Sequence, residues 1–183
     1  PGHADGCTVE GPHPTHSTKT TARFHSATIA YFRALGIPLL RGRFFTGRDD
    51  KDAQVVIIVN ETMAKRYWPG EDPIGKRISF RSEPKEKEWW PVVGVVGDIK
   101  DQPDSSAARP AMWFPLPQWP DSGMSVVVRS TADPAVGAPQ FRLAVRPLDP
   151  QFAVDELRKV SPGPDAARST PGCVPLRWGV LRR

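Results

Sequence analysis

Residues 55–80, with the sequence VVIIVNETMAKRYWPGEDPIGKRISF, carry the pattern of a strand, a short helix, a turn and a second strand. The β-branched run 55–59 is long enough for a buried strand. Asn60 follows it as a helix N-cap, because its side chain can accept a hydrogen bond from a free backbone N–H. Proline and glycine at 69–70 end the helix, and residues 76–80 alternate as in a half-buried strand. We expect this unit to lie at the centre of the fold.

The segments on both sides of this unit are short as well. A helix is predicted over 26–36, where apolar residues recur every three positions before Gly36, a favourable C-terminal cap. A second helix is predicted over 139–148, and residues 152–160 fit either a strand or a short helix. Strand patterns cover 37–43, 89–97, 111–116 and 124–129, and two glycines in 89–97 predict a bulge or a close backbone approach. A strand-rich middle between helix-bearing ends predicts an α+β domain in two lobes.

The composition restricts the classes of function. The chain of 183 residues is 39% hydrophobic, which is sufficient for one domain or two small subdomains. The net charge of +5 suggests nucleic-acid binding, but residues 27–160 hold 19 basic and 17 acidic side chains and are nearly balanced. A phosphate-binding surface needs clustered cations, so nucleic acid is not the expected partner. No apolar run approaches the roughly 20 residues of a membrane-spanning helix, and no signal peptide is recognisable.

Several motifs imitate known sites. Residues 70–77, GEDPIGKR, resemble a phosphate-binding loop, but a helix precedes them and arginine occupies the magnesium position. The sequon at Asn60 is better explained as a helix cap. All four histidines lie within residues 1–25, so no Ser-His or Cys-His pair is predicted in the body of the chain. Asp49 and Asp50 could act as acids or bases, but nothing indicates a pocket around them. We predict no enzyme, no cofactor and no metal site.

Four tryptophans are the remaining candidates for a functional surface. Trp89, Trp90, Trp113 and Trp119 lie in or beside predicted strands. Tryptophan at such positions usually packs in a core, but exposed tryptophans are favoured anchors in protein interfaces and in apolar-ligand grooves. We therefore expect a possible interface that includes these four residues, and no catalytic, cofactor-binding or metal-binding residues.

Longer strings resemble a known family. These strings are YFRALGIPLLRGRFF (31–45), the central stretch 55–80, WWPVVGVVGDIKD (89–101), MWFPLPQ (112–118), SVVVRSTADP (125–134) and AVRPLDPQFAV (144–154). In this order they resemble the periplasmic core domain of MacB-type and FtsX-like ABC transporter permeases, especially the duplicated orphan permease group of acidobacteria. The resemblance covers about 27–160. It implies a porter-like α/β lobe, built from 27–45 and 124–160, with an inserted strand-rich lobe at 46–123.

The resemblance also implies a role and a location. It implies a non-catalytic extracytoplasmic domain on the periplasmic side of the inner membrane, which couples transport or mechanical motion to periplasmic partners. Its expected partners are an ABC ATPase subunit, membrane-embedded permease helices and a periplasmic adaptor or substrate. The alternative is a free-standing periplasmic binding or adaptor module that holds an apolar ligand or a protein.

The two ends of the chain differ in composition from its body. Residues 1–26 and 161–183 show no helical or strand periodicity, and the tail is rich in proline, glycine and arginine. We predict a disordered leader at 1–26 and a disordered tail at 161–183. Because an out-of-frame translation of GC-rich DNA would give such ends, we expect the chain to be a fragment of a larger permease.

Overall fold

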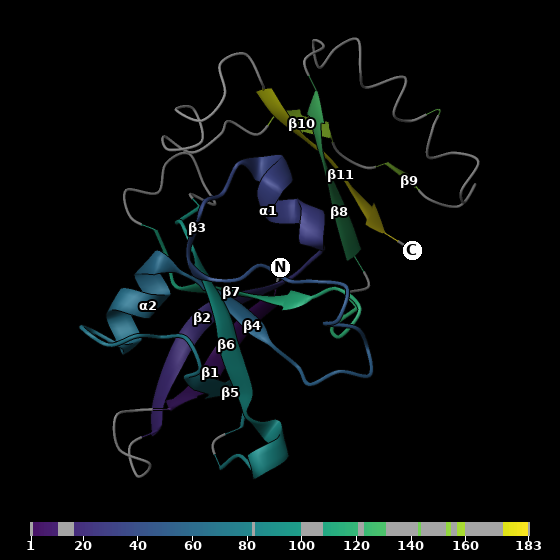
Figure 1. Cartoon of the computed structure of the whole chain (residues 1–183). Coiled ribbons are helices and arrows are strands. Elements are labelled where there is room, and N and C mark those ends of the chain that lie inside the picture. Colours follow the sequence, from purple (N-terminus) through teal and green to yellow (C-terminus); the bar gives the residue numbers. More distant parts are fainter. Residues whose placement is uncertain are drawn as a thin grey trace. The chain divides into compact units, whose positions relative to one another are not determined.

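The computed structural model describes residues 2–10, 17–81, 83–99, 108–120, 123–130, 143, 153–154, 157–159 and 174–182 (Figure 1). The chain divides into two compact units. One unit combines Pro1–Ile29 with Pro38–Pro120, and the other combines Ala30–Ile37 with Asp121–Arg183. No helix in the described part of the chain is both long enough and apolar enough to cross a membrane.

Strands outnumber helices among the described residues. The strands of the first unit are β1 (Gly2–Glu10), β2 (Ser17–Ala27), β3 (Leu39–Gly42), β4 (Ile57–Asn60), β5 (Arg77–Ser79), β6 (Trp90–Val96) and β7 (Ala111–Pro115). Its helices are α2 (Glu61–Tyr67) and the 3-10 helix η1 (Glu86–Glu88). The helix α1 (Ile29–Leu35) lies almost wholly in the second unit, with the strands β8 (Gly123–Ser130), β9 (Ala153–Val154), β10 (Leu157–Lys159) and β11 (Val174–Arg182).

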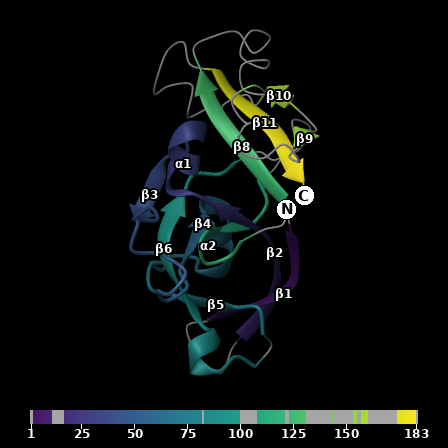
Figure 2. The same ribbon diagram turned by 90° about the vertical axis from the view of Figure 1, so that its right-hand side faces the viewer.

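The sheet of the first unit closes on itself. Its strand order is β3-β6-β4-β7-β2-β1-β5, and β5 also pairs with β6. Six strands therefore form a hydrogen-bonded ring, β6-β4-β7-β2-β1-β5, and β3 pairs with β6 outside it. The pairs β2–β7 and β4–β6 are parallel and the others are antiparallel. In the second unit, β8 and β11 are the long antiparallel neighbours visible side by side in Figure 2.

The core of the first unit lies between this sheet and α2. Three side chains from the helix segment, Met63, Ala64 and Trp68, are buried in one cluster with apolar residues of the sheet. The indole N–H of Trp68 donates to the backbone carbonyl of Glu10 at 3.0 Å. Since that carbonyl is at the end of β1, the bond fixes the first hairpin to the end of α2.

The central unit has the predicted order of strand, helix, turn and strand. All four residues of β4 are buried, and Asn60 caps α2 by accepting from the backbone N–H of Met63 at 3.1 Å. Gly70 and Gly75 in the following turn have φ values of 78° and 83°, which favour glycine. The predicted N-cap and turn are confirmed.

Glycine allows β6 to approach its neighbours closely. A Cβ atom on Gly94 would lie 2.3 Å from the carbonyl oxygen of Arg43. The β4–β6 register also shifts beside this residue, because Ile57 pairs with Val92 and Ile58 with Gly94. The predicted bulge and close backbone approach in 89–97 are therefore both present.

The structure corrects the prediction for the two ends of the chain. Residues 2–10 and 17–27 form β1 and β2, and residues 174–182 form β11, so the prediction of a disordered leader and tail was wrong for these residues. The strands β1 and β2 contain few large apolar residues, and β2 is rich in threonine, so both lack the alternation of apolar and polar residues that predicts a strand. Their backbones pair along the β1–β2 hairpin, with one register shift between Asp5 and Cys7, and this pairing adds them to the sheet without an apolar pattern.

The mixed sheet with few helices agrees with the predicted α+β class. The division into two lobes stays a prediction, with the porter-like lobe at 27–45 and 124–160 and the inserted lobe at 46–123. Of the predicted helix at 139–148, only Leu143 belongs to the described residues, and it is helical. Residues 152–160 hold two short strands, β9 and β10.

Candidate interaction surface

Five aromatic side chains from separate elements meet in the first unit. This aromatic cluster consists of Phe24 on β2, Phe80 after β5, Trp90 on β6, Phe114 on β7 and Trp119 in the turn after β7. Phe114 is buried, and the other four are partly exposed and pack against the core. The cluster therefore joins the hydrophobic core to the surface of the unit.

Phe80 lies at the centre of this cluster. Its ring centroid is 5.0 Å from Trp90, 5.6 Å from Phe114 and 5.7 Å from Trp119. These ring pairs are tilted or T-shaped, with the edge of one ring toward the face of the other. Such a pair contributes about 0.5–1.5 kcal/mol to stability in addition to the burial of its apolar area. The cluster is thus a well-packed part of the fold as well as a partly exposed surface.

The structure separates the four predicted interface tryptophans. Trp90 and Trp119 lie together in the aromatic cluster, with ring centroids 5.7 Å apart. Trp113 is only 2% exposed and stacks on His25 at 5.9 Å, so the prediction that it belongs to a surface was wrong. Trp113 and Phe114 are neighbours on β7, so their side chains lie on opposite faces of the strand. Both faces of this strand are buried.

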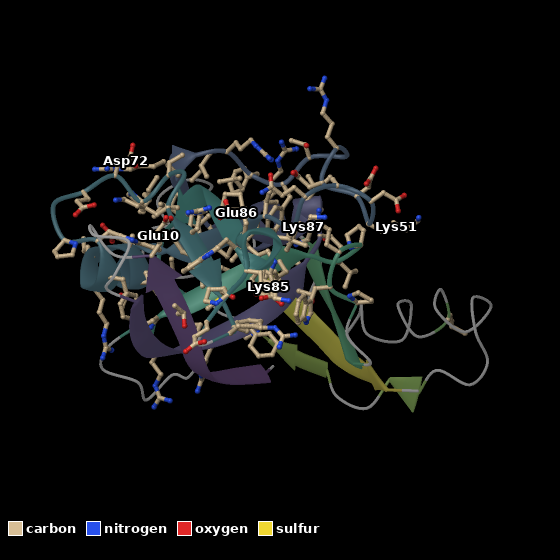
Figure 3. All side chains as sticks on the ribbon, turned by 90° about the horizontal axis from the view of Figure 1, so that it is seen from below. Glu10, Lys51, Asp72, Lys85, Glu86 and Lys87 are labelled. Atoms are coloured by element: carbon tan, nitrogen blue, oxygen red, sulfur yellow. The ribbon has the colours of Figure 1, made fainter. Side chains whose placement is uncertain are left out.

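Trp89 packs against an arginine instead. The guanidinium carbon of Arg77 lies 5.5 Å from the centroid of a Trp89 ring, within the range of a cation–π contact. Arg77 also binds Glu10 through two hydrogen bonds of 3.0 and 2.7 Å, and Glu86 through one of 2.5 Å. Figure 3 shows the side chains of this unit with Glu10 and Glu86 labelled.

This arginine joins the strands where the ring closes. Arg77 is on β5, Glu10 ends β1, and Glu86 belongs to η1 before β6. The Arg77 side-chain hydrogen bonds lower the pKa of Glu10 below its ordinary value, and Glu10 in turn raises the pKa of Arg77. The charged groups therefore stabilise the closure between β1 and β5, where only two residue pairs are formed.

The two carboxylates considered as acids or bases lie in a turn. Asp49 is 6% exposed and accepts two hydrogen bonds from Arg43, at 2.7 and 2.9 Å, and one from the Thr46 backbone at 2.7 Å. Because of the hydrogen bonds from Arg43, the pKa of Asp49 lies below its ordinary value. Asp50 accepts from the backbone N–H groups of Asp52 and Ala53. Both side chains thus hold the conformation of the turn.

Asn60, which is buried, and Asp98, which is exposed, form a polar network that links the core to the surface. The Asn60 amide donates to Asp98 Oδ1 at 2.7 Å and to the carbonyl of Arg109 at 2.9 Å, and its oxygen accepts from Ala111 N at 2.9 Å. Asp98 also accepts from the backbone and the hydroxyl of Thr62. Since Asn60 is 1% exposed, its amide is engaged in the fold and inaccessible to glycosylation in this structure.

The described residues contain no group of three histidine, cysteine, aspartate or glutamate side chains that could hold a metal ion. Cys7 is fully buried, and burial raises the pKa of its thiol to about 11. Such a thiol is a poor nucleophile, because the reactive species is the thiolate. What this part of the chain offers is a partly exposed aromatic surface beside a cluster of ion pairs.

Sequence reasoning missed the three phenylalanines of the aromatic cluster. Phe24 lies in the segment predicted as a disordered leader, and Phe80 and Phe114 lie on different predicted strands. Their common location depends on pairing between strands that are distant in the sequence, such as β2 with β7. Only the register of the closed sheet could have brought them together, and no local pattern contains that register.

Comparisons with known proteins identify the family. The sequence pattern of the MacB-like periplasmic core domain matches residues 7–146. The macrolide export ATP-binding/permease protein MacB of Aggregatibacter actinomycetemcomitans is 30% identical over 79 residues, which are 43% of this chain and 12% of that protein. The MacB of Hahella chejuensis (strain KCTC 2396) is 33% identical over 86 residues, which are 46% of this chain and 12% of that protein.

A solved structure shows the same fold. The crystal structure of the periplasmic region of MacB from Actinobacillus actinomycetemcomitans aligns with a TM-score of 0.50 and 17% identity, over 80% of this chain and 64% of that chain. The family match begins at residue 7, so most of the predicted leader is part of the domain. The chain belongs to the family of MacB-like periplasmic core domains found in ABC transporter permeases.

Proposed function

We propose that this chain acts as a non-catalytic extracytoplasmic domain of an inner-membrane MacB/FtsX-like permease. In this role it couples transport or mechanical motion to periplasmic partners. The observation that carries the proposal is the family match over 7–146, which spans the closed ring of strands except for the first five residues of β1. Its proposed partners are an ABC ATPase subunit, membrane-embedded permease helices and a periplasmic adaptor or substrate.

A stiff body suits a coupling role. The first unit is closed by strand pairing, by the Arg77 ion pairs and by the glycine contacts of β6. Closely packed interiors have low compressibility and transmit displacement rather than absorb it. Motion of membrane helices attached to such a body would therefore reach its far surface with little loss.

The partly exposed tryptophans supply a contact surface for a periplasmic adaptor or substrate. Trp89, Trp90 and Trp119 combine large apolar area with N–H donors, as interface anchors commonly do. Trp89 is held in place by Arg77, so it is already ordered before a partner binds. Preordering reduces the entropy lost on binding.

The test uses the permease that contains this domain, reconstituted with its ATPase in lipid nanodiscs. We expect Trp89→Ser to leave basal ATP hydrolysis unchanged and to weaken its stimulation by the periplasmic partner, whereas Trp89→Phe retains most of the stimulation. Transport and ATP hydrolysis that persist unchanged after removal of the whole domain would contradict the coupling role. So would turnover of a substrate by the isolated chain.

The aromatic cluster favours one alternative, a free-standing periplasmic module that holds an apolar ligand or a protein. Four of its five rings are partly exposed and could contact such a ligand. Titration of the chain with apolar ligands, followed by tryptophan fluorescence, separates the two functions. Saturable quenching with one ligand per chain supports the module, and a flat response supports the permease domain.

A further inference from the structure

The chain forms a turn directly after β7. The backbone N–H groups of Gln118 and Trp119 both donate to the Pro115 carbonyl, each at 3.0 Å. The Trp119 ring stacks on Phe114 at 4.9 Å and packs against the core. The turn, residues 115–119, is therefore held in one conformation by its own hydrogen bonds and by an aromatic contact.

The side chain of Gln118 takes the place of a strand partner beside β4. In the antiparallel β4–β7 pair, Ile58 lies opposite Trp113. The same register would place Val56 opposite Pro115, but proline has no N–H to donate and the chain turns there. The Val56 N–H donates instead to Gln118 Oε1 at 3.2 Å.

The amide of Gln118 binds this segment a second time. Its Nε2 donates to the Gln54 carbonyl at 3.0 Å and to the Ala53 carbonyl at 3.5 Å. One side chain thus both accepts from and donates to the segment that precedes β4. Since Val56 is 6% exposed, its N–H would lose its partner in a largely buried position if the Gln118 amide were removed.

The same turn is also bound to the end of β2. The Leu116 N–H donates to the Ala27 carbonyl at 3.0 Å, and the Ser26 hydroxyl donates to the Trp119 carbonyl. The turn therefore joins two segments that are distant in the sequence, the end of β2 and residues 53–56. All of these residues belong to the first unit.

We propose that the turn 115–119 is an anchor that fixes where the chain leaves the first unit, and that Gln118 is its positioning residue. After β2 the chain enters the second unit at Ala30, and after the turn it enters that unit again at Asp121. The inference deepens the proposed function, on which it rests for the coupling role. A displacement passes along these two segments efficiently only if their starting points are held to the body of the first unit.

The first test measures the position of the turn on the full chain without any partner. Nitroxide labels on Asp52→Cys and Pro120→Cys, both at exposed positions, report their separation through the dipolar broadening of the electron paramagnetic resonance spectrum. Cys173→Ser removes a competing thiol, and Cys7 is buried. We expect Gln118→Ala to weaken the dipolar coupling, because the turn then loses its hydrogen bonds to residues 53–56.

Amide hydrogen exchange of the unlabelled chain separates a local change from unfolding. Gln118→Ala should speed exchange at Val56 about two- to tenfold, the range for loss of one hydrogen bond, and leave Ile58 protected. Gln54→Ala is the matched control, because Gln118 binds the backbone carbonyl of this exposed residue, and it should change neither amide. An unchanged Val56 amide or an unchanged dipolar coupling in Gln118→Ala would overturn the anchor. Faster exchange at Ile58 as well would mean unfolding of the unit and would overturn it too.

The variant Gln118→Glu gives the anchor a pH signature. At neutral pH its carboxylate still accepts from Val56, but it faces the Gln54 and Ala53 carbonyls without a donor, so these oxygens raise its pKa. The dipolar coupling should be weak at neutral pH and recover as the pH falls through this raised pKa, because protonation supplies an O–H donor. The unsubstituted Gln118 chain, labelled at the same positions, is the control. A coupling that follows the same pH dependence in both chains would contradict the proposal.

A last measurement connects the anchor to coupling in the reconstituted permease. Gln118→Ala should leave basal ATP hydrolysis unchanged and reduce its stimulation by the periplasmic partner, whereas Gln54→Ala should retain the stimulation. Full stimulation in Gln118→Ala would overturn the role of the anchor and leave the coupling role of the domain intact. Because the experiments on the isolated chain include no partner, their failure also leaves the proposed function intact.

Discussion

Replacing Asn60 by alanine should destabilise the protein more than the loss of an ordinary helix cap. The side chain makes four hydrogen bonds, with Met63 N, Ala111 N, Asp98 Oδ1 and the Arg109 carbonyl, all between 2.7 and 3.1 Å. Loss of the cap alone costs about 1 kcal/mol. Each buried backbone group left without a partner adds about 1–3 kcal/mol. Besides the cap, the Ala111 N–H loses its partner in a fully buried bond, so we expect a total of about 2–4 kcal/mol.

Urea unfolding followed by far-ultraviolet circular dichroism measures this loss. Domains of this size have unfolding free energies of about 5–15 kcal/mol, so Asn60→Ala should lower the midpoint by a large fraction. A loss below about 1 kcal/mol would refute the reasoning, because water would then replace the side chain at no cost. A conservative comparison is Thr62→Val, which removes only the hydroxyl bond to Asp98 and should cost much less.

The variant Asn60→Asp separates the cap from the rest of the network. A carboxylate still accepts from Met63 and Ala111, but it faces Asp98, so the folded-state pKa of this carboxyl pair rises. The loss of stability in Asn60→Asp is therefore largest at neutral pH, where both carboxyls are charged. It shrinks as the pH falls, because protonation gives the carboxyl an O–H donor again. Adding Asp98→Asn should recover stability at neutral pH. A loss independent of pH would contradict the network.

Three other outcomes follow from the structure. Gly94→Ala should cost several kcal/mol in urea unfolding, because its Cβ would lie 2.3 Å from the Arg43 carbonyl; Gly47→Ala, with nothing within 4 Å, is the control. Stability should fall with acid below the ordinary pKa values of 4.5 for Glu10 and 3.8 for Asp49, since both are lowered in the fold; Glu10→Gln should flatten the slope. Native Cys7 should resist a thiol reagent at pH 8 and react after unfolding, and fast native labelling would contradict its burial.

The sequence predicts those parts of the fold that are determined locally. The N-cap at Asn60, the cap at Gly36 and the bulge near Gly94 all depend on residues within a few positions of each other. Each has a backbone requirement that a particular residue type meets. These features could therefore be found without knowing which strands pair.

The hairpin of β1 and β2 could not be found in this way. Its strands contain few large apolar residues: Cys7, Val9 and Ala22 are buried in the core, and Phe24 packs against it partly exposed. Their pairing with β5 and β7 supplies the stabilisation that their own sequence does not indicate. The same non-local pairing assembles the aromatic cluster, so the sequence predicts its two tryptophans as surface residues but does not predict its three phenylalanines.

The parallel pairing of β2 with β7 determines how the first unit bears a mechanical load. Ala27 and Pro115 lie opposite each other at the ends of these strands, and soon afterwards both chain segments continue into the second unit. The Leu116 N–H donates to the Ala27 carbonyl at 3.0 Å, and the Ser26 hydroxyl donates to the Trp119 carbonyl. A force that pulls on the chain after Ala27 and after Pro115 therefore acts on β2 and β7 in the same direction, and the two strands do not slide past each other. The tension passes instead into the antiparallel neighbours β1 and β4, where hydrogen bonds lie across the direction of pull and must break together.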